Sequence, residues 1–417
     1  MFMKKNVCVF IFAVILIASF IGCTNEDENP HSLESALEES KVNITAYEYF
    51  PENTGLAISR FSQDLFRKLL ASDDKNVVVS PVSAYYVLSM VSLGAEGDTL
   101  YEFESVLGGN AHEIARELSA LSHNLTSAGS STRINMAGSV WVTDDYIINP
   151  DFNRTMITYF HAPALTRDFS EQSVVDEINA WIYDQTQGLI DKTLEQIEPD
   201  VIMLLINTLY LSAKWASNFN PMAERQSVFY PENCEQTEVT FLYTNHISLS
   251  VSITDYYEAV LLPYSGRLGF FMVRPTTGKS VRDFATSYDI LKIFNEIDIR
   301  SEVLVSMPML DLDYSIRMND YLEMMGLILA FDDRLSGLGE MIEDDASKHI
   351  YLSEVRQQIR LKVHSEGTEA SAITVGLPAL ESALQQPIEI NFNTPYIFMI
   401  YDTHTNIPLF MGVTDNP

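Results

Sequence analysis

The segment from Val363 to Leu384 carries the side chains that most restrict what the chain can do. The run before it, Arg356 to Val363, alternates between apolar and polar residues, as a strand with one buried face does. From Gly367 to Ala372 the side chains become small or β-compatible, a composition that suits both an exposed loop and the crowded centre of a sheet. Such a segment can form an exposed loop or an extra strand. A flexible linker is the alternative.

The polar residues in the rest of the chain do not form a catalytic motif. The sequence contains no Gly-x-Ser-x-Gly elbow, His-Glu-x-x-His helix, P-loop or Gly-x-Gly-x-x-Gly, and its eight histidines occur singly. The acidic cluster Glu343-Asp344-Asp345 lacks the oxygen spacing of a calcium-binding loop, which favours a solvated turn. We therefore expect the chain not to be an enzyme, and we expect no cofactor and no metal ion.

Composition and charge limit the partners and the number of domains. With 26 basic and 57 acidic residues the formal net charge is −31, so a phosphate backbone would be repelled and a nucleic-acid partner is not expected. The 417 residues, with 47% apolar side chains, are enough for a large core. No Pro-, Gly- or Ser-rich spacer interrupts the sequence from Gly55 onward, which favours one large domain over several.

The amino terminus has the pattern of an export signal. Lys4 and Lys5 precede an apolar run from Val7 to Ile21 that is too short for a comfortable membrane-spanning helix. The run leads into Gly22-Cys23, and a small residue directly before a cysteine is similar to the bacterial lipobox, in which the cysteine is lipidated. Residues 1–22 are therefore predicted to be a bacterial lipoprotein signal peptide, with an ordinary secretory peptide as the alternative.

Residues 23–54 are acidic and polar, which predicts a disordered tether. The expected protein is secreted across the inner membrane and held by a lipid on Cys23 as an outer-membrane or cell-surface lipoprotein that faces outward, with a periplasmic orientation as the alternative. The lipid would be its only contact with the membrane. Cys234 is then the remaining thiol, and it is expected to be passive because no Lys, Arg or His lies within several residues of it.

Two further stretches are predicted to position the Val363–Leu384 segment. Asn76 to Val79 is a short β-branched run, and Ser80-Pro81 follows as the cap and first residue of a helix to about Leu93. Ser83 lies one turn further along, on the same side of this helix. Val201 to Tyr210 is nearly all apolar, as expected of a strand buried on both faces.

Several motifs, found in the same order, give the chain a resemblance to the serpin family, the serine protease inhibitors. Glu366-Gly367-Thr368-Glu369-Ala370-Ser371-Ala372 is similar to the serpin hinge, and Asn207 to Trp215 is similar to the Asn-x-x-Tyr-Phe-x-x-x-Trp signature. Asn76 to Ser83 and Ile178 to Ile190 also resemble serpin segments. The resemblance covers residues 55–417 and implies an α+β fold. This would be a serpin-like single domain, with three β-sheets, surrounding α-helices and an exposed reactive loop at about residues 365–387.

The resemblance also implies roles for individual residues and a function. Ser80, Ser83, Asn207 and Gln357 would lie at the shutter in the centre of the main sheet, and Trp215 at the breach, where the hinge first inserts. A serpin of this kind is a suicide inhibitor of serine-type and also cysteine-type endopeptidases, which become trapped as acyl-enzymes when the hinge inserts. The expected protein is a monomer. A non-inhibitory serpin used for binding or as a scaffold on the cell surface is the alternative, and a surface glycan-binding lipoprotein is a third class.

Three residues depart from the family pattern. Ser365 stands where the hinge usually begins with Glu, and Ile373 replaces a customary small residue, so both could slow insertion. Gln357 stands where many serpins carry a shutter His, and it should cost at most one hydrogen bond because Gln both donates and accepts. Insertion would point small side chains inward and place Ile373 on the outer face; the inward residues are Thr368, Ala370, Ala372 and Thr374.

The position of the cleaved bond follows from the usual loop length of the family. Counting from the hinge places it at Glu381-Ser382, with Leu380-Glu381 one residue short, and counting back from Pro395 gives Leu384-Gln385. No Lys or Arg occurs from Gly367 to Pro395, so a trypsin-like protease is not the expected target. The expected target is an elastase-, chymotrypsin- or subtilisin-like protease that accepts Leu380, or a Glu-specific protease that accepts Glu381.

Overall fold

The computed structural model describes residues 50–72, 76–126, 132–191, 194–217, 219, 224–232, 234–245, 247–343, 349–368 and 388–417. Cys23, the predicted signal peptide and most of the predicted tether lie outside the described residues, as do Leu380, Glu381, Ser382 and Leu384. Within the described residues, no helix is both long enough and apolar enough to span a bilayer.

The described strands form two sheets, and the first has ten strands. Its strand β10 joins two halves, because Ile299–Val303 pair with β7 whereas Ser306–Pro308 pair with β6. The sequence led us to expect three sheets, and this one shared strand reduces them to two. In hydrogen-bonded order the strands are β1 (Val77–Val79), β16 (Pro408–Thr414), β15 (Tyr396–Asp402), β9 (Leu268–Pro275), β8 (Tyr257–Pro263), β7 (Ile247–Ile253), β10 (Ile299–Pro308), β6 (Thr237–Tyr243) and β5 (Arg225–Phe229), and β14 (Ile388–Asn391) also pairs with β10.

The second sheet contains the strands on both sides of the predicted hinge. In order they are β11 (Leu310–Arg317), β12 (Glu354–His364), β13 (Gly367–Thr368), β4 (Met203–Lys214), β2 (Thr132–Thr143) and β3 (Ala164–Arg167). Apolar residues of β12 alternate with polar ones and are buried, as its sequence predicts. Met203–Leu211 of β4 are buried without interruption, which confirms a strand covered on both faces.

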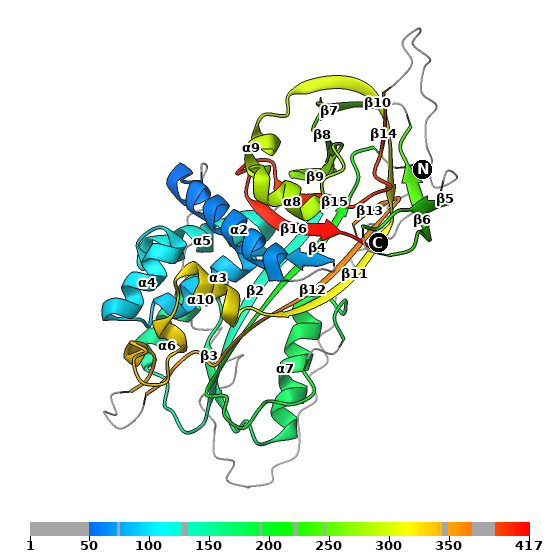
Figure 1. Ribbon diagram of the computed structural model, residues 1–417. Coiled ribbons are helices and arrows are strands. Elements are labelled where there is room, and N and C mark those ends of the chain that lie inside the picture. The colour runs from blue at the N-terminus through cyan, green and yellow to red at the C-terminus, as the bar shows by residue number, and fades with distance from the viewer. Residues whose placement is uncertain are drawn as a thin grey trace, which may run out of the picture.

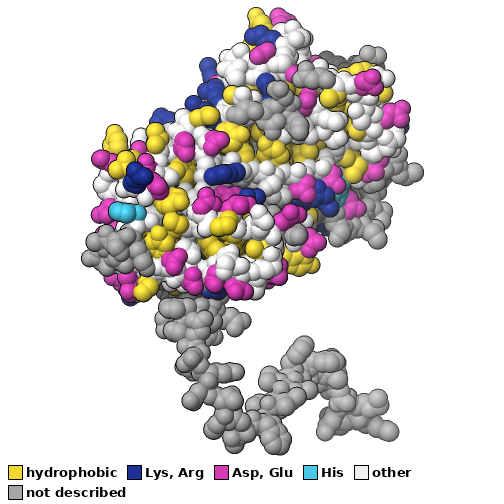
Figure 2. All heavy atoms as spheres, turned by 60° about the horizontal axis from the view of Figure 1, so that its bottom comes forward, with side chains coloured by type: hydrophobic (Ala, Val, Ile, Leu, Met, Phe, Trp, Pro, Cys, Tyr) yellow, Lys and Arg dark blue, Asp and Glu magenta, His cyan; other side chains and the backbone are white. Residues whose placement is uncertain are grey.

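Helices cover the two faces of this second sheet unequally (Figure 1). On one face Leu205 of β4 packs into the main core with α3 and α5, whereas on the other face Leu204 and Ile206 pack into a smaller cluster under α7. The helices are α2 (Glu52–Ser72), α3 (Pro81–Ser92), α4 (Gly97–Leu107), α5 (Ala111–Thr126), α6 (Pro150–Phe160), α7 (Gln172–Gln185), α8 (Val281–Ser287), α9 (Ile290–Asn295), α10 (Asn319–Met325) and the 3-10 turns η2 (Leu329–Phe331) and η3 (Gly339–Met341). Acidic side chains are spread over the face shown in Figure 2, in keeping with the net charge of −31.

The α+β class is confirmed, but two boundaries differ from those expected. The first helix begins at Glu52, within the predicted tether of residues 23–54, because Pro51 precedes it and an acidic residue in the first turn suits the helix dipole. Thr54 in this turn also hydrogen-bonds Glu117, so residues 52–54 belong to the fold and not to a tether. The predicted loop starts too early as well, since Gly367 and Thr368 already lie in the sheet as β13.

Candidate functional site

The predicted hinge begins between two parallel strands, β12 and β4. At one end of the sheet these strands pair directly, through Glu354–Gln357 and Leu204–Asn207. At the other end β13 lies between them, because Thr368 pairs with Val363 of β12 and with Ala213 of β4. In the interval, within the described ranges, residues 358–362 pair only with β11 and residues 208–212 pair only with β2. Over this interval the facing edges of β12 and β4 therefore pair with no other described strand.

Four predicted residues meet at the point where β4 and β12 separate. The Gln357 side chain accepts a hydrogen bond from Ser80 N at 2.8 Å and donates to Ser80 O at 3.0 Å and to Asn207 Oδ1 at 2.7 Å. Ser83 Oγ donates to Asn207 Oδ1 at 3.0 Å. All four side chains belong to fully buried residues. Gln357 thus ties β12 to β4 and to the start of α3 through three hydrogen bonds.

This buried cluster, Ser80, Ser83, Asn207 and Gln357, also contains polar atoms without partners. Ser80 lies at the N-cap position of α3, but its hydroxyl makes no capping hydrogen bond. The backbone N–H of Ser80 donates instead to the side-chain oxygen of Gln357. Ser80 Oγ and Asn207 Nδ2, and also Thr208 Oγ1 on the opposite face of β4, find no hydrogen-bond partner within the described part of the chain. A buried polar group without a partner costs about 1–3 kcal/mol. These unpaired atoms therefore destabilise the folded protein at this point of the sheet.

At the other end of the interval, the chain needs a glycine to enter the sheet. Gly367 has φ +146°, and a Cβ built on it would lie 2.1 Å from the carbonyl oxygen of Ala213. Any other residue would have to move β13 away from β4. The Gly367 of the hinge motif is therefore required by close backbone approach and by its dihedral angle together.

Two stacked aromatic rings support β13. Trp215 Nε1 donates to His364 O at 2.8 Å, and the ring of Trp215 stacks on that of Tyr264 at 4.2 Å and 6°. The hydroxyl groups of Tyr264 and Thr368 are 2.6 Å apart. Burial raises the pKa of Tyr264 far above its ordinary value of 10.0, so its hydroxyl keeps its proton. The contacts to His364 and to Thr368 thus fix the chain before and after the backbone turn at residues 364–367.

A family model described as Serpin (serine protease inhibitor) matches residues 56–417. The chain belongs to the serpin family. Serpins are protease inhibitors and not enzymes.

Curated serpins and a solved serpin structure are similar over most of this chain. Serine protease inhibitor A3M of Mus musculus is 27% identical over 376 residues, which are 86% of this chain and 87% of that protein. Leukocyte elastase inhibitor of Xenopus tropicalis is 28% identical over 381 residues, 88% of this chain and 100% of that protein. The crystal structure of Tengpin, a thermophilic serpin, in the native state has a TM-score of 0.84 and 25% identity, and the match covers 91% of this chain and 98% of that one.

The structure of this serpin brings the predicted residues into two separate groups. Ser80, Ser83, Asn207 and Gln357 form the buried cluster, whereas Trp215 lies with the hinge start at the other end of the interval. Ser365 is buried and Glu366 accepts a hydrogen bond from Trp215 N at 3.1 Å. The remaining predicted hinge residues, Glu369, Ala370, Ser371 and Ala372, lie outside the described residues.

Two participants at the hinge start were not among the predicted site residues. Tyr264 follows an apolar strand ending in Leu262-Pro263, and nothing in that pattern marks its hydroxyl as a partner of Thr368. His364 has a lowered pKa, mainly because burial disfavours its charged form, although Glu366 and Glu224 partly oppose this. Its position at the end of an alternating strand gave no signal of that environment.

Proposed function

We propose that this serpin is a suicide inhibitor of serine-type endopeptidases, with cysteine-type endopeptidases as a further target class. The nucleophile of the protease attacks the carbonyl carbon of the scissile residue. The C–N bond breaks, the new amino terminus leaves with a proton, and the amino-terminal part of the loop remains bound as an acyl-enzyme. The hinge then inserts between β4 and β12 before water releases the enzyme. Relatives named serine protease inhibitor and leukocyte elastase inhibitor support this class of function.

The observation that carries this proposal is the register of β13. Since Thr368 lies opposite both Ala213 and Val363, a strand that continued from it would bring Thr374 opposite Asn207 and Gln357. Asn207 and Gln357 are also the last residues through which β4 and β12 pair directly. The available interval therefore accepts residues 369–373 without any change to that direct pairing.

The alternation of side chains in such a strand suits a buried sheet. Thr368 shares its face with Ala213 and Val363 in the core, and the residues that would follow on that face, Ala370, Ala372 and Thr374, are all small. Ile373 would lie on the other face, opposite Thr208 and Gln358, which are both buried. An apolar side chain there needs space but adds no unpaired polar group. We therefore expect that Ile373 does not prevent insertion.

The target follows from the loop sequence. A trypsin-like specificity pocket requires a cation, and the sequence has none from Gly367 to Pro395. The proposed targets are elastase-, chymotrypsin- or subtilisin-like enzymes that cleave after Leu380, or Glu-specific enzymes that cleave after Glu381. Cleavage between Leu384 and Gln385 is the other candidate position.

A protease panel tests the proposal. The purified protein is incubated with chymotrypsin, pancreatic elastase, subtilisin, a Glu-specific protease and trypsin, and each mixture is run on a denaturing gel. We expect an SDS-stable complex with at least one of the first four, and mass spectrometry of the released peptide then identifies the bond. Cleavage of the loop by all four with no stable complex would reject inhibition and favour the non-inhibitory serpin. A cut before Ala379 would reject our register for the loop.

We further propose that the protein is a surface lipoprotein anchored through Cys23. The support is the order Lys4-Lys5, apolar run and Gly22-Cys23 at the amino terminus. Expression with a radiolabelled fatty acid in a bacterial host should label the natural chain and not a Cys23→Ser variant. External protease added to intact cells then distinguishes an outward-facing protein from a periplasmic one.

A further inference from the structure

The turn from Tyr264 to Arg267 bridges three strands at the hinge start. The Tyr264 hydroxyl bonds Thr368 of β13, and Thr132 Oγ1 of β2 donates to Ser265 O at 2.9 Å. Thr132 and Thr368 are the two neighbours of Ala213 on β4, one on each side. Ser265 N also donates to Lys214 O at 2.7 Å, on β4 itself. The turn is therefore bonded to β2, β4 and β13 at the same level of the sheet.

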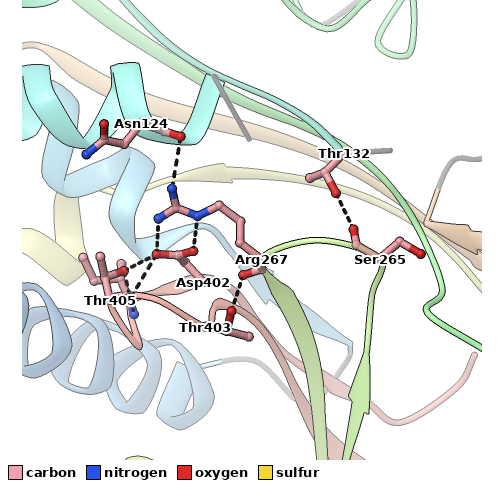
Figure 3. Close-up of polar contacts among 8 residues, drawn as sticks. Asn124, Thr132, Ser265, Arg267, Asp402, Thr403 and Thr405 are labelled. Atoms are coloured by element: carbon pink, nitrogen blue, oxygen red, sulfur yellow. Dashed lines mark hydrogen bonds and ion pairs between the residues drawn. The ribbon is translucent and has the colours of Figure 1, made fainter. Parts of the chain in front are cut away.

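The far end of this turn is fixed by a buried ion pair (Figure 3). Arg267 Nε and Nη2 donate to the two carboxylate oxygens of Asp402 at 2.5 and 2.6 Å, and Nη1 donates to Asn124 O at 3.1 Å. Asp402 has a side chain exposure of 0% and Arg267 of 12%. Thr405 N and Oγ1 donate to the same carboxylate, and Thr403 N and Oγ1 donate to the carbonyl oxygen of Arg267.

These contacts join the hinge start to β9 and β15 of the first sheet. Asp402 ends β15, Arg267 precedes β9, and residues Leu268 and Asp402 are paired across those two strands. A bidentate Arg–carboxylate pair fixes geometry more strictly than a single contact does. We propose that the Arg267–Asp402 ion pair positions the Tyr264–Arg267 turn so that Tyr264 seats Thr368, and that it thereby sets how readily the hinge continues into the sheet.

The chain offers a matched control at the other end of the same strand. Arg274, near the end of β9, donates through Nε and Nη2 to Glu258 of β8 at 3.0 and 2.7 Å, and both side chains are 20% exposed. This pair joins β8 to β9 away from the hinge start. The double variant Arg274→Met/Glu258→Gln therefore removes an Arg–carboxylate pair without touching the turn.

The seating part of the proposal is tested without any protease. Hydrogen exchange is followed by mass spectrometry for peptides that cover residues 363–368. In Arg267→Met/Asp402→Asn, which removes both charges together, these amides should exchange at least about tenfold faster than in the natural chain. Arg267→Lys keeps the positive charge but not the bidentate contact to Asp402, and it should give a smaller increase in exchange rate. This single variant keeps the test decisive if the double variant does not fold. Exchange that is unchanged, or equally faster in the Arg274→Met/Glu258→Gln control, would overturn the proposal.

The insertion part rests on the proposed inhibitory function. With a protease that the natural chain traps, Arg267→Lys should consume more inhibitor molecules per trapped protease, and the control should not. Faster exchange with unchanged consumption would overturn the link between seating and insertion. If the natural chain traps no protease, inhibition itself fails, and the exchange measurement alone decides whether the ion pair seats the hinge.

Discussion

Under the proposed mechanism, replacement of Thr368 by Arg should convert the protein from an inhibitor into a substrate. Thr368 is 1% exposed, and its side chain lies against the buried hydroxyl of Tyr264 and between β12 and β4. A guanidinium group at this position cannot reach water while β13 stays in the sheet. We therefore expect the hinge to start from an unseated state, and its insertion to require either burial of a charge or a large distortion.

The structure allows an order-of-magnitude estimate of how much this substitution slows insertion. Burial of a charge without a partner costs several kcal/mol after relaxation, and we take about 3 kcal/mol as the lower end. Every 1.4 kcal/mol is a factor of ten, so insertion should slow by roughly 100-fold or more. Hydrolysis of the acyl-enzyme by the target does not depend on this residue. The branching between trapping and release should therefore shift by about the same factor.

The assay is the number of inhibitor molecules consumed per protease trapped, measured by titration and by the SDS-stable band. Thr368→Ser keeps the hydroxyl and serves as the control, which should behave as the natural chain does. Thr368→Val removes the hydroxyl and leaves the Tyr264 hydroxyl buried without its partner, at a cost of about 1–3 kcal/mol. Its consumption of inhibitor per trapped protease should therefore lie between those of the Ser and Arg variants. An Arg variant that traps as efficiently as the Ser variant would refute the seating of Thr368 as a requirement for insertion.

Cleavage of the loop should raise the melting temperature by about 10 °C or more, measured by calorimetry, because residues 208–212 and 358–362 gain a paired strand. Gln357→Leu should lower the free energy of unfolding by about 1–3 kcal/mol in denaturant titration, because it leaves the buried Ser80 N–H without an acceptor and removes one of the donors to Ser80 O and to Asn207 Oδ1. Gly278→Ala should cost about 1–2 kcal/mol from its φ of +72° alone, whereas Gly367→Ala should cost clearly more, because its Cβ also meets a backbone oxygen. Burial lowers the pKa of His364 in the folded protein below its ordinary 6.5, so the unfolded chain binds the proton first. The stability from neutral His364 is therefore present above pH 6.5 and is lost as the pH falls below it, and His364→Gln should flatten this part of a plot of melting temperature against pH.

Local patterns were sufficient for the elements but not for their contacts. The alternation in Arg356–Val363 predicts β12 correctly, and Ser80-Pro81 predicts the start of α3. The three hydrogen bonds of Gln357 were not predictable in this way, because Ser80 and Asn207 are 277 and 150 positions away from it. Their approach depends on sheet register, which family resemblance supplied for the serpin motifs and residue spacing alone did not.

The parts that sequence reasoning missed share one physical cause. Arg267 and Asp402 lie 135 positions apart, and each looks locally like an ordinary polar residue, Arg267 directly before an apolar run and Asp402 directly after one. Tyr264 likewise reads as core, and its role depends on a hydroxyl that points at Thr368. The shared strand β10, which merges two expected sheets into one, is also a pairing between distant segments. Propensity and periodicity describe single elements, whereas these features belong to pairs of elements.

In the mechanism that we propose, the geometry between β4 and β12 implies that insertion meets its main resistance part-way. Residues 369–373 would meet edges that are unpaired with any described strand, so their entry breaks no pairing between described strands. Thr374 would then arrive at Asn207 and Gln357, where every further residue must separate β4 from β12 and where three hydrogen bonds hold Gln357. The same position contains the unpartnered Ser80 Oγ and Asn207 Nδ2, so a strand with a hydroxyl there can satisfy groups that are buried and unpaired in the described part of the chain. The cost of separating β4 from β12 and the gain from new hydrogen bonds thus arise at the same buried cluster. In the proposed mechanism, the balance of the two decides whether the hinge inserts past Asn207 and Gln357.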